Sequence, residues 1–161
     1  MAAAVLLAAA ILAQQTSVQP ERPLPPAAAA MFAPPSPSPD LVALRAEIAT
    51  GPVDPVWSAA TEAALSRIYH RATAPSGSLA SLDITCNASL CEVLGVSREG
   101  LTNAGIKAMT DAVQSRETNE AISAMKLDNI VQGFHSTSVG DTGDAPATIV
   151  FAAYWRRADG A

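Results

Sequence analysis

The chain has 161 residues, a formal net charge of −5 and an apolar share of 49%, of which little is aromatic. Its charges are spread without long runs, so it has no basic patch of the kind that binds nucleic acid. Alanine is abundant, and the few large apolar side chains must therefore supply much of any core; among them are Trp57, Phe134, Phe151 and Trp155.

Residues 2–13 form an unbroken run of alanine, valine, leucine and isoleucine. A helix that spans a bilayer needs about 20 apolar residues, so this run is too short to cross a membrane comfortably. The small residues that end at Ala13 fit a signal-peptide cleavage site. We therefore predict that residues 1–13 are a signal peptide or a short N-terminal hydrophobic segment, with membrane contact only if the segment stays uncleaved. An alanine-rich soluble helix is the alternative interpretation.

Residues 14–39 differ sharply in composition, with eight prolines between Val18 and Pro39. Proline-rich segments favour the extended polyproline II conformation, and little here could form a core. We predict a disordered proline- and alanine-rich linker. A single domain over residues 40–161 should follow it, because that length matches the commonest domain size.

Two helices are predicted at the start of this domain. Asp40 can cap a helix over residues 41–50. Asp54 followed by Pro55 is a usual helix start, and apolar residues at helical spacing extend this second helix to about Arg71.

Residues 81–96 predict a β-hairpin that carries both cysteines of the chain. Side chains alternate between faces along a strand, so Ile84 shares a face with Cys86, and Cys91 shares one with Val93. Cysteines that face each other across an antiparallel pair lie at a separation that permits a bridge. We predict a structural disulfide between Cys86 and Cys91, which is typical of an oxidising, extracytoplasmic compartment.

Two other uses of the cysteine pair are open. Redox chemistry usually relies on C-x-x-C at a helix start, whereas this pair is C-x4-C within a hairpin. A zinc site would need two more ligands, and the chain offers only His70 and His135, without ligand-like spacing. We therefore expect no metal and no cofactor.

The second half of the domain repeats the order of the first. A cap at residues 102–103 begins a helix, a break follows near residues 116–119, and a further helical segment is predicted to run toward Gly133. Residues 134–139 and 148–155 are predicted to be strands of a second hairpin. The order helix, helix, strand, strand, helix, helix, strand, strand predicts an α+β domain, an antiparallel sheet of two β-hairpins with helices packed on one face.

Three features resemble a recurrent pattern: Trp57-x4-Glu62 on a helix, Cys86-x4-Cys91-x-Val93 on a hairpin, and a closing strand that ends in arginine. Together they resemble small uncharacterised secreted or envelope proteins of proteobacteria, over roughly residues 54–157. The resemblance implies an envelope location and the disulfide, and it brings no assigned activity.

No catalytic residue is predicted. His70 should end a helix and His135 should lie in a strand; a small periplasmic hydrolase would need one of them beside a serine and an aspartate in one cleft. The chain has no Gly-x-Ser-x-Gly nucleophile motif. Asp83 and Glu92 can face each other across the hairpin, but on a face that we expect to be solvated.

Two places could form a binding surface. The stapled turn would present Asn87 and Leu90 at little ordering cost, and the paired guanidiniums of Arg156 and Arg157 suit anionic partners. We expect a non-catalytic binding or assembly module of the bacterial cell envelope, in the periplasm, with an envelope protein of unknown identity as its partner. A thiol-disulfide redox sensor and a small periplasmic hydrolase are the alternatives.

Overall fold

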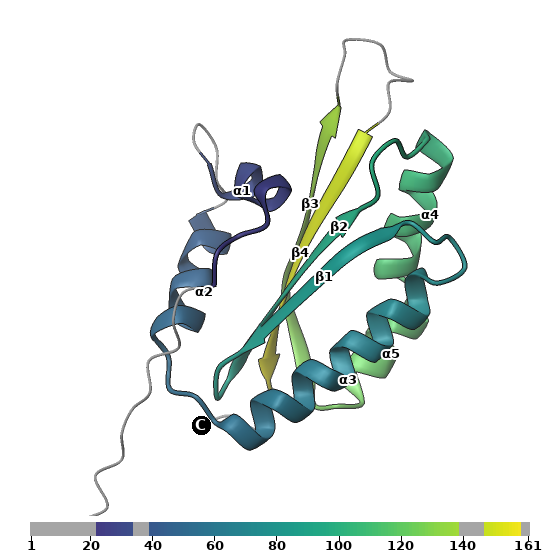
Figure 1. Ribbon diagram of the computed structural model, residues 1–161. Helices are drawn as coiled ribbons and strands as arrows, with labels where there is room; N and C mark the ends of the chain where they lie inside the picture. Colours follow the sequence, from purple (N-terminus) through teal and green to yellow (C-terminus); the bar gives the residue numbers. More distant parts are fainter. Residues whose placement is uncertain (1–21, 34–38, 139–146, 159–161) are drawn as a thin grey trace, which may run out of the picture.

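The computed structural model describes residues 22–33, 39–138 and 147–158, which form one sheet with helices on both sides (Figure 1). The elements are α1 (Pro26–Phe32), α2 (Pro39–Thr50), α3 (Pro55–Thr73), β1 (Leu79–Cys86), β2 (Leu90–Ser97), α4 (Asn103–Val113), α5 (Arg116–Ser123), β3 (Leu127–Ser138) and β4 (Ala147–Arg157). The described strands form an antiparallel sheet in the order β1-β2-β4-β3. This confirms the predicted α+β class and the order of helices and strands from α2 onward. The predicted signal peptide lies outside the described residues, and no described helix is long and apolar enough to cross a membrane.

The first hairpin has the predicted register. Cys86 lies opposite Cys91, and Ile84 lies opposite Val93. The two cysteines form the predicted disulfide, with their Cα atoms 4.0 Å apart. The bond therefore closes the turn between β1 and β2.

The helices α3, α4 and α5 pack on the face of the sheet that carries the cysteines. The first core lies between them, and its largest buried side chains are Leu65, Tyr69, Met109, Ile122, Phe151 and Trp155. Nε1 of Trp155 donates a hydrogen bond to the hydroxyl of Tyr69 at 3.0 Å, so the buried indole keeps a partner.

A glycine of β2 makes room for an aromatic ring in this core. Gly95 lies opposite Phe151, and a Cβ atom on Gly95 would stand 2.0 Å from Cε1 of that ring. Contacts under 3 Å force a neighbour to move, and this neighbour is fully buried. The close approach of ring and backbone therefore depends on glycine.

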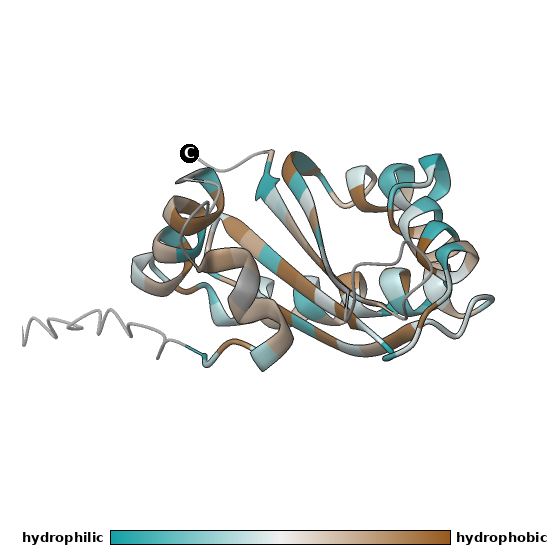
Figure 2. Cartoon of the chain, turned by 90° about the horizontal axis from the view of Figure 1, so that it is seen from above, coloured by the Kyte–Doolittle hydropathy of each residue, from teal (hydrophilic) through white to brown (hydrophobic). Residues whose placement is uncertain are grey.

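In place of the predicted helices on one face, the structure has helices on both. In the view from above, strands with long apolar segments lie between two groups of helices (Figure 2). The second face carries its own core, formed by Ala28, Met31, Leu41, Leu44, Ile48, Leu90, Leu94, Val96, Val150, Ala152 and Tyr154. The reason is that β2 has apolar side chains on both faces, with Cys91 and Val93 in the first core and Leu90, Leu94 and Val96 in the second. Such a strand needs cover on both faces.

Residues 22–33 lie on this second face, although the sequence predicted a disordered linker there. We call them the strap. Proline fits the first turn of a helix, where its fixed φ is favourable and its missing N–H is not needed, and Pro26 occupies this place in α1. Ala28 and Met31 are buried against the sheet. Proline thus starts a short helix in this segment.

The predicted helix toward Gly133 is replaced by a strand. The helix α5 ends at Ser123, and Lys126 has a positive φ of 59° that turns the chain away from the helix. The strand β3 then runs from Leu127 to Ser138, with a register shift between Asn129 and Val131. Pairing with β4 over this length outweighs the local helical spacing.

Candidate functional site

The stapled turn is part of the second core and does not present a surface. Asn87 is 1% exposed and Leu90 is fully buried. Oδ1 of Asn87 accepts hydrogen bonds from the backbone N–H groups of Ser89 and Leu90, while Nδ2 donates to the carbonyl of Glu47 at 3.0 Å. The proposed role of Asn87 and Leu90 as a contact surface is therefore corrected: both hold the turn against α2.

The two C-terminal arginines tie β4 to helices. Both guanidinium nitrogens of Arg156 donate to the carboxylate of Glu47, at 2.8 and 3.0 Å, and this hydrogen bonding raises the pKa of Arg156. The guanidinium of Arg157 lies 5.0 Å from the ring centre of Trp57, with Asp54 nearby at 3.8 Å. Neither cation is left unpaired for an anionic partner.

The Trp57-x4-Glu62 spacing also has a structural role. Trp57 lies under Arg157, and Oε1 of Glu62 accepts the backbone N–H of Cys86 at 2.8 Å. The two side chains thus join α3 to the end of β4 and to the end of β1. Because both cysteines are also fully buried, the disulfide lacks the exposure that a thiol sensor requires.

The two histidines lie on different sides of the sheet. His70 is exposed in the last turn of α3, which covers the first face. Phe134 packs against the first core, so the alternation along β3 turns His135 to the second face. Among the described residues, neither imidazole bonds to a serine or an aspartate, and no group of three or more metal-ligating side chains gathers. A Ser-His-Asp arrangement is not assembled in this part of the chain.

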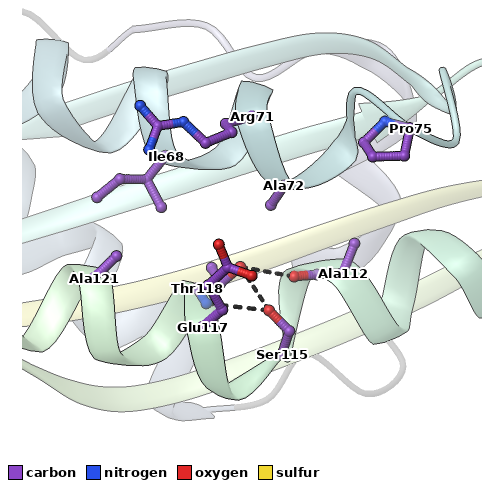
Figure 3. Close-up of a pocket in the computed structure, with 9 residues that line it drawn as sticks. All are labelled: Ile68, Arg71, Ala72, Pro75, Ala112, Ser115, Glu117, Thr118 and Ala121. Carbon is purple, nitrogen blue, oxygen red and sulfur yellow. Dashed lines mark hydrogen bonds between the residues drawn. The ribbon is translucent and has the colours of Figure 1, made fainter.

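A shallow groove of about 380 Å³ separates α3 from α4 and α5 (Figure 3). It is lined by Ile68, Arg71, Ala72, Pro75, Ala112, Ser115, Glu117, Thr118 and Ala121. The two hydroxyl groups that line it already have hydrogen-bond partners. The hydroxyl of Thr118 donates to the carbonyl of Ala112, and the hydroxyl of Ser115 caps α5 by accepting the N–H of Thr118. The exposed, oppositely charged side chains of Arg71 and Glu117 also line the groove (Figure 3).

A buried ionic cluster lies on the second face, where the sequence predicted solvated carboxylates. The side chain of Glu92 is only 6% exposed. Nη1 of Arg45 donates to its Oε1 at 2.5 Å, and the hydroxyl of Tyr154 donates to its Oε2. Burial raises the pKa of Glu92 above the ordinary value of 4.5, although both hydrogen bonds oppose the rise. Burial also raises the pKa of Tyr154, so the tyrosine is a neutral donor.

The same arginine holds the strap. Nη2 of Arg45 donates to the carbonyl of Arg22 at 2.8 Å, and its guanidinium lies 5.5 Å from the ring centre of Phe32. The side chain of Arg22 in turn pairs with Asp83 on β1. Arg45 therefore contacts both ends of the strap while it neutralises Glu92.

The two edges of the sheet differ. Along β1, the carboxylate of Glu62 accepts the N–H of Cys86, and Arg22 donates to the carbonyl of Ile84 at 3.5 Å. Along β3, no described strand pairs with the outer side. Its last eight residues, 131–138, pair with β4 without a shift and include no proline and no charged residue. Prolines and charged residues usually protect an edge strand from pairing with another chain. Because residues 131–138 lack both, this part of β3 is an open edge. It lies next to the side chain of Ile130, which is 41% exposed.

Sequence reasoning missed this edge, because it assigned half of the strand to a helix. It missed the ionic cluster because it took the second face as solvated. The signal for burial of that face was the run of apolar residues at successive positions in 149–155. No family model, no curated protein and no solved structure matches the chain.

Proposed function

We propose that the chain is a non-catalytic extracytoplasmic binding or assembly module of the cell envelope, and that it binds a partner protein along β3. The observation that carries this proposal is the open edge of residues 131–138. An edge strand has backbone N–H and C=O groups that face outward, and an extended segment of another chain can pair with them.

The side chains around the edge suit an uncharged, extended partner segment. Residues 131–138 carry no charge that would repel or select a charged strand. Ile130, at the register shift, offers an exposed apolar side chain to the same partner. Backbone pairing would supply the affinity, and contacts with alternate side chains would supply the specificity.

The buried disulfide supports an extracytoplasmic location, because such bonds form and persist in oxidising compartments. Intact-mass analysis of the chain from an envelope fraction, with and without reduction and alkylation, tests this part. We expect loss of about the first thirteen residues and two thiols that are blocked until reduction. An unprocessed chain with two free thiols would remove the support for export.

A photo-crosslinking residue at Ser136 tests the partner site in bacteria that export the chain. Ser136 is exposed on β3, and Ser81, exposed on β1, is the matched control. We expect a discrete envelope adduct at position 136 only, and its loss in Ile130→Lys. The purified partner should slow amide hydrogen exchange in residues 131–138 by about tenfold or more, in keeping with new backbone hydrogen bonds. Equal adducts at both positions, or unchanged exchange, would place binding elsewhere.

A further inference from the structure

We propose that the groove between α3 and α5 binds a small zwitterion, in which an ammonium group and a carboxylate share one apolar body, as in an apolar amino acid or a short apolar peptide. Arg71 pairs with the carboxylate of this ligand, and Glu117 pairs with its ammonium group. The groove lies among the helices that cover the first face, so the inference does not depend on the proposed pairing along β3.

The groove is open because small side chains line both of its walls. Figure 3 shows Ala72 pointing from α3 into the groove, with Ala112 of α4 and Ala121 of α5 on the opposite wall. An alanine leaves free the space that a longer side chain would fill by close packing. Ile68 and Pro75 add apolar surface toward the two ends (Figure 3). The volume of about 380 Å³ lies within the range of about 300–1,000 Å³ that is usual for small-ligand pockets.

Two opposite charges lie on the facing walls of the groove. The side chain of Arg71 extends along α3, and the carboxylate of Glu117 points from α5 toward α3 (Figure 3). Both side chains are exposed, and within the described ranges neither forms a hydrogen bond or an ion pair. The neighbouring Arg116, by contrast, pairs with Glu120 at 2.6 Å. Arg71 and Glu117 are therefore available to the charged groups of a ligand.

A zwitterion fits these two charges better than an ion of one sign does. An anion that approaches Arg71 is repelled by Glu117 across the groove, and a cation that approaches Glu117 is repelled by Arg71. A molecule that carries both groups meets an opposite charge at each of them. The hydroxyl groups of Ser115 and Thr118 already have partners, so the rest of the groove favours an apolar body.

Titration of the full chain, followed by the chemical shifts of its backbone amides in NMR spectra, tests the site. The probes are L-leucine and the dipeptide leucyl-alanine. Because exposed ion pairs contribute little to affinity, we expect Kd values of about 1 mM, with saturable shifts in residues 68–75 and 112–121. The tighter of the two probes tells whether the natural ligand is closer to a free amino acid or to a short peptide.

Modified probes assign each charge of the ligand to one residue. Acetylation of the amine of the tighter probe, or amidation of its carboxylate, should weaken binding to the parent chain by about fivefold, the upper value for an exposed ion pair. Glu117→Gln should weaken the unmodified probe by a similar factor but should not weaken the acetylated one. Arg71→Gln should weaken the unmodified probe but not the amidated one.

Two further sets of variants serve as controls. Arg22→Gln and Asp83→Asn make the same charge changes at the pair that joins the strap to β1, away from the groove, and should leave every affinity unchanged. Ala121→Leu narrows the groove and should weaken all probes alike. The proposal would be overturned by an absence of saturable shifts in both ranges, by modified probes that bind as tightly as the zwitterion, or by losses in R22Q and D83N equal to those in R71Q and E117Q.

Discussion

Replacing Arg45 by methionine should leave the carboxylate of Glu92 buried without its cation. The two side chains are 15% and 6% exposed, and their atoms lie 2.5 Å apart. Removal of one partner of a buried ion pair costs about 3–5 kcal/mol, because the remaining charge is desolvated without compensation. We expect the lower end, about 3 kcal/mol, since the hydroxyl of Tyr154 still donates to the carboxylate.

The loss should depend on pH in a direction that the pKa of Glu92 fixes. Burial raises this pKa above 4.5 in the folded chain, so the native state binds the proton more tightly than the unfolded state. The contribution of Glu92 to the free energy of unfolding is then full below pH 4.5 and is lost as pH rises through the native pKa. Without Arg45 the native pKa rises further, because one group that stabilises the anion is gone. R45M also loses the contacts of Arg45 with Arg22 and Phe32, which do not depend on pH. The gap between R45M and the parent chain should thus be smallest near pH 4 and widen toward pH 8.

Urea unfolding at pH 4, 6 and 8 measures this gap. In R45M/E92Q the buried charge is absent, so we expect the pH dependence of the gap to disappear. Lys107→Met breaks an exposed pair with Asp111 and should change stability by no more than about 0.5 kcal/mol. A loss in R45M that is equal at pH 4 and pH 8 would refute the reasoning, because the charge of Glu92 would then not be its cause.

Three further changes test the packing. Replacing Cys86 and Cys91 by alanine should lower the free energy of unfolding by about 2 kcal/mol, the loop-closure value for so short a loop, measured by urea unfolding; an unchanged free energy of unfolding would show that the bond contributes little. Gly95→Val should cost about 1–3 kcal/mol, because its Cβ would meet the ring of Phe151; an unchanged unfolding midpoint would contradict the close contact. Tyr69→Phe removes the acceptor of the buried indole in β4 and should cost about 1–3 kcal/mol; no loss of stability and no change in tryptophan fluorescence would show that the bond contributes little.

The first core could be predicted because it follows from strict alternation. Cys86 and Ile84 on one strand, with Cys91 and Val93 on the next, determine a register that brings the cysteines together. The disulfide needs only that register and a short turn. Local pattern was enough here because the interacting residues are close in sequence.

The second core could not be predicted from alternation, because on β2 and β4 it occupies the positions between those of the first core. Leu94 and Val150 are buried there. A strand covered on both faces reads as a continuous apolar run, which leaves the direction of each side chain unspecified. The run indicates that both faces are covered, but which helices cover the second face depends on where α1 and α2 dock.

The same uncertainty explains why Glu92 was misjudged. A glutamate beside Val93 in a hairpin is solvated when one face is open, and buried when α2 lies over that face. Its cation, Arg45, comes from α2 itself, 47 residues earlier in the chain, so no local pattern links the two.

The strap shows why composition and spacing have to be considered together. A proline-rich segment cannot form a long helix, and this is the physical reason to expect a linker. Leu24, Ala28 and Met31 nevertheless recur at intervals of four and three residues, the spacing of one helix face, and all three contact the second core. Two turns of helix need only a proline at the start and two apolar side chains that reach a waiting surface. Because that surface, rather than the segment, supplies most of the stabilisation, so short a helix is ordered where it lies on the sheet.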